Sequence, residues 1–340
     1  MIIELIIEYG LGIQRGCFVV EGDTEFVVDF HCHYAGPEWP ALPPVNSLPE
    51  HVARWMGIAR RIADLDGLIR DQQEAGVDLR VLSAPPALVT PDGAHLQISA
   101  MQAMNDHLGE VVARSAHLAG LATIDAYQGE ASAAEVERVS RELELPGIVV
   151  DCAHGDLFLD APQARATLQV AADLGLAVFA HPVSPKELSA ELAPLGNWGR
   201  MLARGTSSAA SLLALVNSGV LDEVDGLQIV FAWLGGGGLV VAGTLPGAER
   251  LRQTAPPDER WHVYFDTMGF EPSSLRYAVD LLGSDHVLVG SDWPIGLNVA
   301  SRTRVHETLD HAGLEGADRQ MVSCDNALRL LGRARSPIAS

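Results

Sequence analysis

Short runs of apolar residues recur along the chain, and each run ends in polar residues or glycine. The runs are continuously apolar, without alternation between apolar and polar positions. Continuous apolar runs of this length are typical of parallel strands that are buried on both faces. The predicted strands lie within residues 25–33, 77–86, 118–127, 145–156, 175–182, 227–236, 261–269 and 286–294.

The segments between these runs show the apolar spacing of helices. Examples are PEHVARWMGIARRIADLDGLIRDQQEAG after the first run and APQARATLQVAADLG after the fourth, and both end in glycine, a common helix stop signal. Eight alternations of strand and helix predict a (β/α)8 TIM barrel of the α/β class, formed by residues 1–340 as a single domain. An open doubly wound sheet would need a glycine-rich phosphate loop after the first strand, and DFHCHY is not such a loop.

Three segments fall outside this alternation. Residues 1–24 contain LIIEYGLGI and CFVVEGD, which predict a short N-terminal β extension that covers the bottom of the barrel. Residues 34–50 are rich in proline, and they are predicted to form a long loop at the top of the barrel, where the strands end. Residues 183–210 are predicted to form a second insertion on the same face.

The charge of the chain narrows the choice of partners. Lys and Arg number 23 and Asp and Glu number 44, which gives a net charge of −21. Such an acidic protein repels nucleic-acid phosphates and anionic lipids, so binding to nucleic acid or to a membrane is not expected. The start, MIIELIIEYG, has no basic residue before its apolar part and is not a signal peptide. Four scattered cysteines without a CxxC pair favour a reducing compartment, and we expect a cytoplasmic protein.

Polar side chains at the strand ends define a candidate site, because active sites of such barrels lie at the carboxyl ends of the strands. His31 and His33 close the first strand at spacing i, i+2, which directs both imidazoles to one face. His181 closes the fifth strand and Asp292 the eighth. Three nitrogen ligands and one oxygen ligand on one axis predict a site for a single divalent cation with room for water or substrate. A polar pocket without a metal is the alternative.

Other residues near the strand ends are candidates for accessory roles. Cys32 lies between the two histidines and is expected to pack against the helical layer as a small apolar residue. For Asp266, Asp151 and His154 a role in the pocket and a structural or surface role are both open. The candidates for binding a substrate carboxylate are Arg54, Arg60, Arg61, Arg200 and Arg204. The candidates for the walls of an aromatic-sized pocket, with ordinary loop packing as the alternative, are Trp39, Met268, Phe270 and Trp293.

The ordered motifs DFHCH, VFAHP, LGG, YFDT and GSDWP, followed by NALRLLG, resemble those of the metal-dependent amidohydrolase superfamily. Within it, the chain is most similar to the branch of the aminocarboxymuconate-semialdehyde, resorcylate and carboxyvanillate decarboxylases. The resemblance implies one Zn²⁺ or a similar ion such as Mn²⁺, held by His31, His33, His181 and Asp292. It also implies a homodimer that decarboxylates a small carboxylic acid. The fourth strand ends in VVDCAHGD without the lysine of binuclear members, which agrees with a single metal.

The chain departs from this branch at Trp233, in the sequence AWLGGGG, where relatives place a histidine beside the metal. Indole neither accepts a proton nor binds a metal. Asp292 is then the candidate proton carrier, with His181 beside it. A hydrolase of esters, lactones or amides, and a member with altered or lost catalysis, are the alternatives to a decarboxylase. The glycines after Trp233 are expected to let the backbone pass close to a bound ligand.

Overall fold

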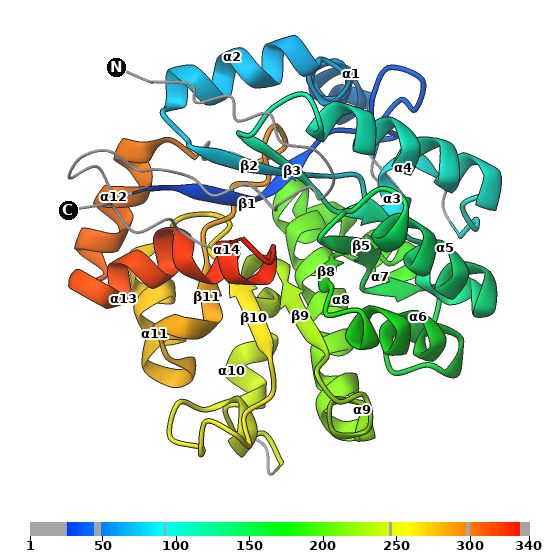
Figure 1. Ribbon diagram of the computed structural model, residues 1–340. Helices are drawn as coiled ribbons and strands as arrows, with labels where there is room; N and C mark the ends of the chain where they lie inside the picture. Colours follow the sequence, from blue (N-terminus) through cyan, green and yellow to red (C-terminus); the bar gives the residue numbers. More distant parts are fainter. Residues whose placement is uncertain (1–25, 44–48, 92, 245–246, 297–299, 334–340) are drawn as a thin grey trace, which may run out of the picture.

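A ring of short parallel strands lies at the centre of the protein and is surrounded by helices (Figure 1). The computed structural model describes residues 26–333 except 44–48, 92, 245–246 and 297–299, so the predicted N-terminal β extension lies outside the described residues. All eight predicted runs contain strands, and the third run contains two short ones. The strands of the ring are β1 (Val28–His33), β2 (Leu79–Ser83), β3 (Leu118–Gly120), β4 (Ala122–Thr123), β5 (Gly147–Asp151), β8 (Ala177–His181), β9 (Gln228–Phe231), β10 (Val263–Asp266) and β11 (Val287–Leu288).

Backbone hydrogen bonds join two sheets into the ring. One sheet has the order β1-β2-β3 and the other β11-β10-β9-β8-β5-β4. The segment after β11 pairs with β1, since Phe30 N donates to Val289 O at 2.9 Å and His33 N donates to Trp293 O at 2.7 Å. On the other side, Leu121 lies between β3 and β4, and its N–H donates to Leu82 O at 2.9 Å. The predicted α/β barrel is therefore confirmed.

Helices occupy the connections between the strands, as the sequence predicts. The second predicted insertion, 183–210, is mainly helical: it contains a short helix and the first half of a 22-residue helix that covers the cavity described below. A small hairpin, β6 (Ala153–His154) with β7 (Leu157–Phe158), follows β5. The helices are α1 (Pro49–Ile62), α2 (Leu65–Ala75), α3 (Pro86–Val89), α4 (Ile98–Val112), α5 (Glu130–Arg141), α6 (Pro162–Asp173), α7 (Lys186–Glu191), α8 (Asn197–Ser218), α9 (Val220–Glu223), α10 (Gly238–Ala242), α11 (Pro272–Leu282), α12 (Arg302–His311), α13 (Gly316–Gln320) and α14 (Asn326–Leu330).

Two layers of apolar side chains hold the ring in place. The inner layer fills the barrel with residues such as Phe30 and Phe179, whose rings pack edge to face with their centroids 5.9 Å apart. Leu328 and Leu330 of α14 belong to this layer, and α14 lies across the ring in Figure 1. The outer layer packs between the strands and the surrounding helices. Because both layers are apolar, the strands read as continuous apolar runs in the sequence.

None of the described helices combines the length and the hydropathy that a membrane-spanning helix needs.

Candidate active site

Four residues from three strand ends meet at one point of the barrel. His31 and His33 end β1, His181 ends β8, and Asp292 follows β11. Each offers one potential ligand atom, and these atoms all lie within 4.8 Å of one another. The Nε2 atoms of His31 and His33 are 3.2 Å apart, and Asp292 Oδ1 lies 2.9 Å from His33 Nε2. The structure thus brings together the four residues that the sequence singles out.

The donor atoms of this group fit a divalent cation. His181 is buried, and within the described part of the chain neither of its ring nitrogens has a hydrogen-bond partner. Burial lowers the pKa of His181 well below its usual value and also lowers the pKa of His33, which keeps both imidazoles neutral. Burial by itself would raise the pKa of Asp292, but the close contact with His33 and the positive charge of Arg204 bring it below its usual value. Neutral imidazoles and an ionised carboxylate are common ligands of Zn²⁺ and Mn²⁺.

Hydrogen bonds behind the two histidines of β1 fix their orientation. His31 Nδ1 lies 2.7 Å from Asp266 Oδ2, and His33 Nδ1 donates to the carbonyl of Ser83 at 3.3 Å. With the protons on Nδ1, both Nε2 lone pairs point toward Asp292 and His181. Asp266 is anchored in turn, because its Oδ1 accepts the backbone N–H of Trp233 at 2.6 Å. These contacts agree with both roles open for Asp266, since it orients His31 and also accepts backbone N–H groups at the end of β10.

A β-bulge directs the histidines into the barrel. Asp29 and Cys32 of β1 pair with positions only two residues apart on β2, so β1 holds one extra residue between them. Phe30 packs inside the barrel, and Cys32 packs in the outer layer as predicted. The extra residue resets the alternation, which allows His31 and His33 to face the interior next to Phe30.

Asp292 is held by the segment on either side of it. Its backbone has a positive φ of 58°, and its N–H donates to His31 O at 2.9 Å. The preceding Ser291 donates through N and Oγ to the buried carboxylate of Asp29, at 2.9 and 2.6 Å. Trp293 follows, buried beneath the Arg80 guanidinium at 5.0 Å. These contacts offset the strain of the left-handed residue.

Gly290 allows His31 and Asp266 to approach each other closely. A Cβ atom at this position would lie 2.7 Å from the Cβ of His31 and 2.9 Å from the Cβ of Asp266. Such distances are well below van der Waals contact, so any side chain here would push the two residues apart. The glycine of the GSDWP motif is therefore part of the site.

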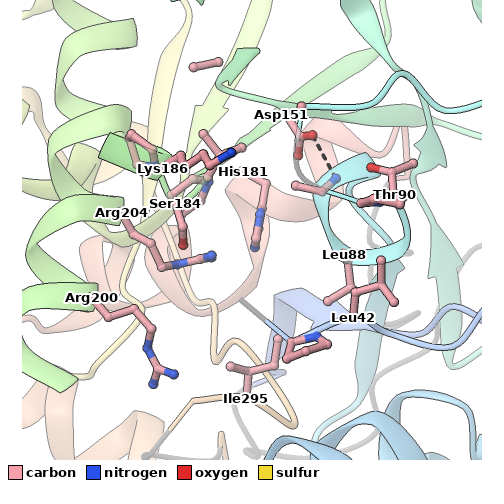
Figure 2. Close-up of a pocket in the computed structure, with 18 of the residues that line it drawn as sticks. Leu42, Leu88, Thr90, Asp151, His181, Ser184, Lys186, Arg200, Arg204 and Ile295 are labelled. Atoms are coloured by element: carbon pink, nitrogen blue, oxygen red, sulfur yellow. Dashed lines mark hydrogen bonds between the residues drawn. The ribbon is translucent and has the colours of Figure 1, made fainter. Parts of the chain in front are cut away.

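A cavity of about 650 Å³ opens next to the four residues. His181 and Asp292 line it directly (Figure 2). Figure 2 shows apolar side chains on one side of this space and two arginines extending from α8 on the other. The apolar side chains are Leu42, Leu88 and Ile295, and the arginines are Arg200 and Arg204. A small molecule with an apolar body and an anionic group matches this lining.

Arg204 is the arginine best placed to bind an anion. Among the described residues, its guanidinium has no hydrogen-bonded or ion-paired partner, and its charge acts on Asp292. Arg200 contacts Asn197 Oδ1 at 2.5 Å, and Arg54 also lines the cavity. The remaining two candidates, Arg60 and Arg61, are exposed on α1 and are not among the described residues of the lining.

Trp233 occupies a different place from the one expected. The described lining of the cavity does not include it, and its backbone adopts a positive φ of 54°. A Cβ atom on Gly205 of α8 would lie 3.1 Å from the indole Cζ3, so the ring packs closely against this helix. The following glycines serve the same contact: a Cβ on Gly236 would lie 2.2 Å from Gly205 O. The glycine run therefore passes close to α8, and the expected close approach to a ligand stays a prediction.

Of the four residues predicted to form the walls of an aromatic-sized pocket, only some line the cavity. Met268 lines the cavity, whereas Trp39, Phe270 and Trp293 are absent from its described lining. His154 does face the cavity, and its ring stacks on His95 at 4.1 Å with an angle of 9° between the planes. Sequence reasoning missed Ser83, Arg80 and the bulge, for which the strand pattern gives no signal.

His154 belongs to a second group of potential ligands, with His95 and Asp125. His95 Nδ1 and Asp125 Oδ2 are 2.9 Å apart, which is a hydrogen bond. The lone pair of an imidazole nitrogen lies in the ring plane, and two nearly parallel stacked planes share no point at which one ion could bind both rings. This group is therefore a hydrogen-bonded rim, and the geometry favours a single metal, at the first group.

Comparisons with known proteins agree with this geometry. The chain is 27% identical over 305 residues to a gamma-resorcylate decarboxylase of Polaromonas sp. strain JS666, covering 81% of this chain and 90% of the relative. It is 23% identical over 337 residues to a 2-amino-3-carboxymuconate-6-semialdehyde decarboxylase of Dictyostelium discoideum, covering 90% of this chain and 91% of the relative.

Solved structures show the same fold. A dihydroxybenzoic acid decarboxylase from Polaromonas sp. JS666, with bound manganese and the inhibitor 2-nitroresorcinol, superposes with a TM-score of 0.71 at 23% identity over 91% of this chain and 97% of that one. The family model described as amidohydrolase matches residues 28–333, which include all the strands of the ring and all four candidate metal ligands. The chain belongs to the amidohydrolase family.

Proposed function

We propose that the protein is a metal-dependent decarboxylase, a carboxy-lyase that acts on a small aromatic or muconate-like carboxylic acid. One divalent cation, Mn²⁺ or Zn²⁺, would be held by His31, His33, His181 and Asp292. The observation that carries the proposal is the convergence of these four side chains at a cavity whose wall presents Arg204, for which the described residues provide no hydrogen-bond or ion-pair partner. The named activities of the relatives support the same reaction class.

The reaction replaces a carboxylate on carbon by a proton. A bound divalent cation supplies positive charge that orients the acid and stabilises negative charge on its oxygens. Arg204 binds the anionic end of the substrate, and the apolar wall around Leu88 excludes water from its body. Asp292 lines the cavity; its carboxylate takes up a proton from water and passes it to the carbon that bears the carboxylate. The carbon–carbon bond then breaks, its electron pair restores the conjugated system, and CO₂ leaves.

Trp233 does not block this chemistry in our proposal. Its ring packs against α8, its backbone N–H donates to Asp266, and the side chain is not among the described residues that line the cavity. We expect Trp233→His to change CO₂ release by less than tenfold. An increase of a hundredfold or more in the variant would show that Trp233 silences the family reaction and would favour the member with altered catalysis.

The main test measures metal content and CO₂ release together. The purified protein is expected to hold one equivalent of a divalent ion and to release CO₂ from at least one acid of a panel that includes 2,6-dihydroxybenzoate. Asp292→Asn is expected to abolish turnover, and Asp156→Asn, an exposed change on the loop after β6, serves as the matched control. Hydrolysis of esters or lactones without CO₂ release would instead support the hydrolase.

We also propose a homodimer. Helix α8 turns Arg200 and Arg204 toward the cavity, and on its opposite side Trp198 is 81% exposed and Leu202 is 53% exposed. Val240 of the neighbouring α10 is 56% exposed. Exposed large apolar side chains are candidates for a subunit interface, and we propose that these three take part in one. Light scattering is expected to give twice the chain mass, and Trp198→Glu to give a monomer; a monomeric wild-type protein would contradict the dimer.

A cytoplasmic location belongs to the same proposal. Cys32, Cys152 and Cys324 are buried, and no disulfide joins them, which suits a reducing compartment. Fractionation of the source cells is expected to recover the protein with cytosolic markers, and recovery with an extracellular fraction would contradict this.

A further inference from the structure

A second polar group of the cavity has unused hydrogen-bonding capacity. Asp151, the last residue of β5, lines the cavity and is only 7% exposed. Its Oδ2 accepts the N–H of Ala87 at 2.8 Å, as the dashed line in Figure 2 shows. Its Oδ1 is buried and has no hydrogen-bond partner among the described residues.

This arrangement is not explained by a structural role alone. Ala87 requires only one acceptor, and a side-chain amide would supply it without a buried charge. A buried polar atom that lacks a partner destabilises the folded protein, so such atoms are usually satisfied by protein, water or ligand. The hydroxyl of Ser184, also on the cavity wall, is a second buried group without a partner in the described part of the chain.

The position of Asp151 relative to the metal group defines what it could contact. Arg204, Asp292 and Asp151 line the same cavity, and the charge of Arg204 acts on both carboxyl groups. A ligand whose carboxylate binds Arg204 near Asp292 can therefore extend another substituent toward Asp151. The apolar side chains across the cavity would contact the body between the two ends.

We propose that Asp151 is a specificity-determining residue whose unused Oδ1 hydrogen-bonds a hydroxyl substituent of the substrate. The proposal rests on the proposed function for the placement of the acid's carboxylate. A second carboxylate at this position would be repelled by Asp125, whose charge acts on Asp151, and by Asp151 itself wherever Asp151 is ionised. An ammonium group would be repelled by Arg204. A hydroxyl group carries no charge and can both donate and accept, so it fits the carboxyl in either protonation state.

The test compares affinities of matched acids for the metal-loaded protein. Dissociation constants of benzoate and of its three monohydroxy derivatives are measured by calorimetry. The wild-type protein is expected to bind at least one hydroxybenzoate tenfold or more tightly than benzoate, which is about 1.4 kcal/mol. Asp151→Ala and Asp151→Leu are expected to reduce this ratio to within twofold of one. Asp151→Asn, which can still accept from Ala87 and donate into the cavity, is expected to keep most of it.

The controls separate this role from a structural one. Asp156→Ala changes an exposed aspartate of the neighbouring loop and is expected to leave the ratio unchanged. Thermal unfolding identifies variants that fold, and two apolar variants of different size are used so that one folded protein suffices. The proposal is overturned if a folded Asp151→Ala or Asp151→Leu protein keeps the wild-type ratio. It is also overturned if the wild-type protein prefers no hydroxybenzoate.

The two proposals fail in different ways. If no acid is decarboxylated but the affinity ratio depends on Asp151, the decarboxylase proposal is wrong and the hydroxyl site remains. If CO₂ is released but the ratio is insensitive to Asp151, the reaction remains and the hydroxyl site is wrong.

Discussion

Asp266→Asn is the substitution that tests the architecture of the site most directly. The carboxylate of Asp266 receives three donors: Nδ1–H of His31 on Oδ2 at 2.7 Å, and the backbone N–H groups of Trp233 and Met268 on Oδ1 at 2.6 and 3.0 Å. Asparagine has the same shape but only one acceptor oxygen. One side of the amide must therefore present its NH₂ group to a donor.

The less costly orientation can be worked out from these contacts. If the NH₂ group faced the backbone, two N–H groups would lose their acceptor, at about 1–3 kcal/mol each. If it faces His31, the imidazole can adapt by accepting at Nδ1, which moves its proton to Nε2. The Nε2 atom of His31, which points toward Asp292 and His33, is then protonated and has no lone pair left for a metal. Loss of such a supporting contact weakens metal binding roughly 10–100-fold, or about 1.4–2.7 kcal/mol.

The assay is a metal titration against a chelating indicator, with Mn²⁺ and Zn²⁺ in separate experiments. Asp266→Asn is expected to bind at least tenfold more weakly than the wild-type protein. Asp280→Asn, an exposed aspartate on α11, is the matched control and is expected to bind normally. Wild-type affinity in Asp266→Asn would refute the reasoning, because it would mean that His31 does not need its Nδ1 partner to act as a ligand.

Further predictions concern stability. Gly290→Ala places a methyl group 2.7 Å from the Cβ of His31 and 2.9 Å from that of Asp266, and it is expected to destabilise the protein by about 1–3 kcal/mol. The control Gly57→Ala lies in open space on α1 and is not expected to destabilise the protein. Equal chemical denaturation midpoints of the two variants would contradict this. A chelator is expected to lower stability by about 2.7 kcal/mol relative to free metal at 100 times its Kd, and an unchanged Tm would count against a bound ion. Burial raises the pKa of Asp151 from 3.8 to about 8. The folded state therefore retains a proton that the unfolded chain releases, and stability falls as the pH rises from about 4 to about 8. The Tm of Asp151→Asn relative to the wild-type protein is expected to rise over that interval, and a constant difference would contradict the shift.

The sequence was informative where a residue's position on a strand decides its neighbours. The apolar runs reveal the strands, parallel strands end at one face, and so His31, His33, His181 and Asp292 could be grouped without coordinates. The family resemblance added the expected chemistry of that group. These inferences require only the period of the backbone and the direction of the strands.

Side-chain directions beyond the strand ends could not be derived in the same way. Trp233 and Asp292 both follow strands, and both adopt a positive φ, where the alternation of a strand no longer applies. One side chain turns toward α8 and the other into the site. The sequence does not reveal the bulge before Cys32 either, because the bulge depends on the pairing of β1 with β2. Tertiary contacts decide all three cases.

The way in which the ring closes has a consequence for biosynthesis. His33 and Asp292 are 259 residues apart in the chain, and they meet only when the segment after β11 pairs with β1. Contacts this distant in sequence form late, because the chain between them must be ordered first. A growing polypeptide whose segment after β11 has not yet been made lacks Asp292, one of the four ligands. We therefore expect the ion to be acquired after translation, so that metal loading reports on completed folding.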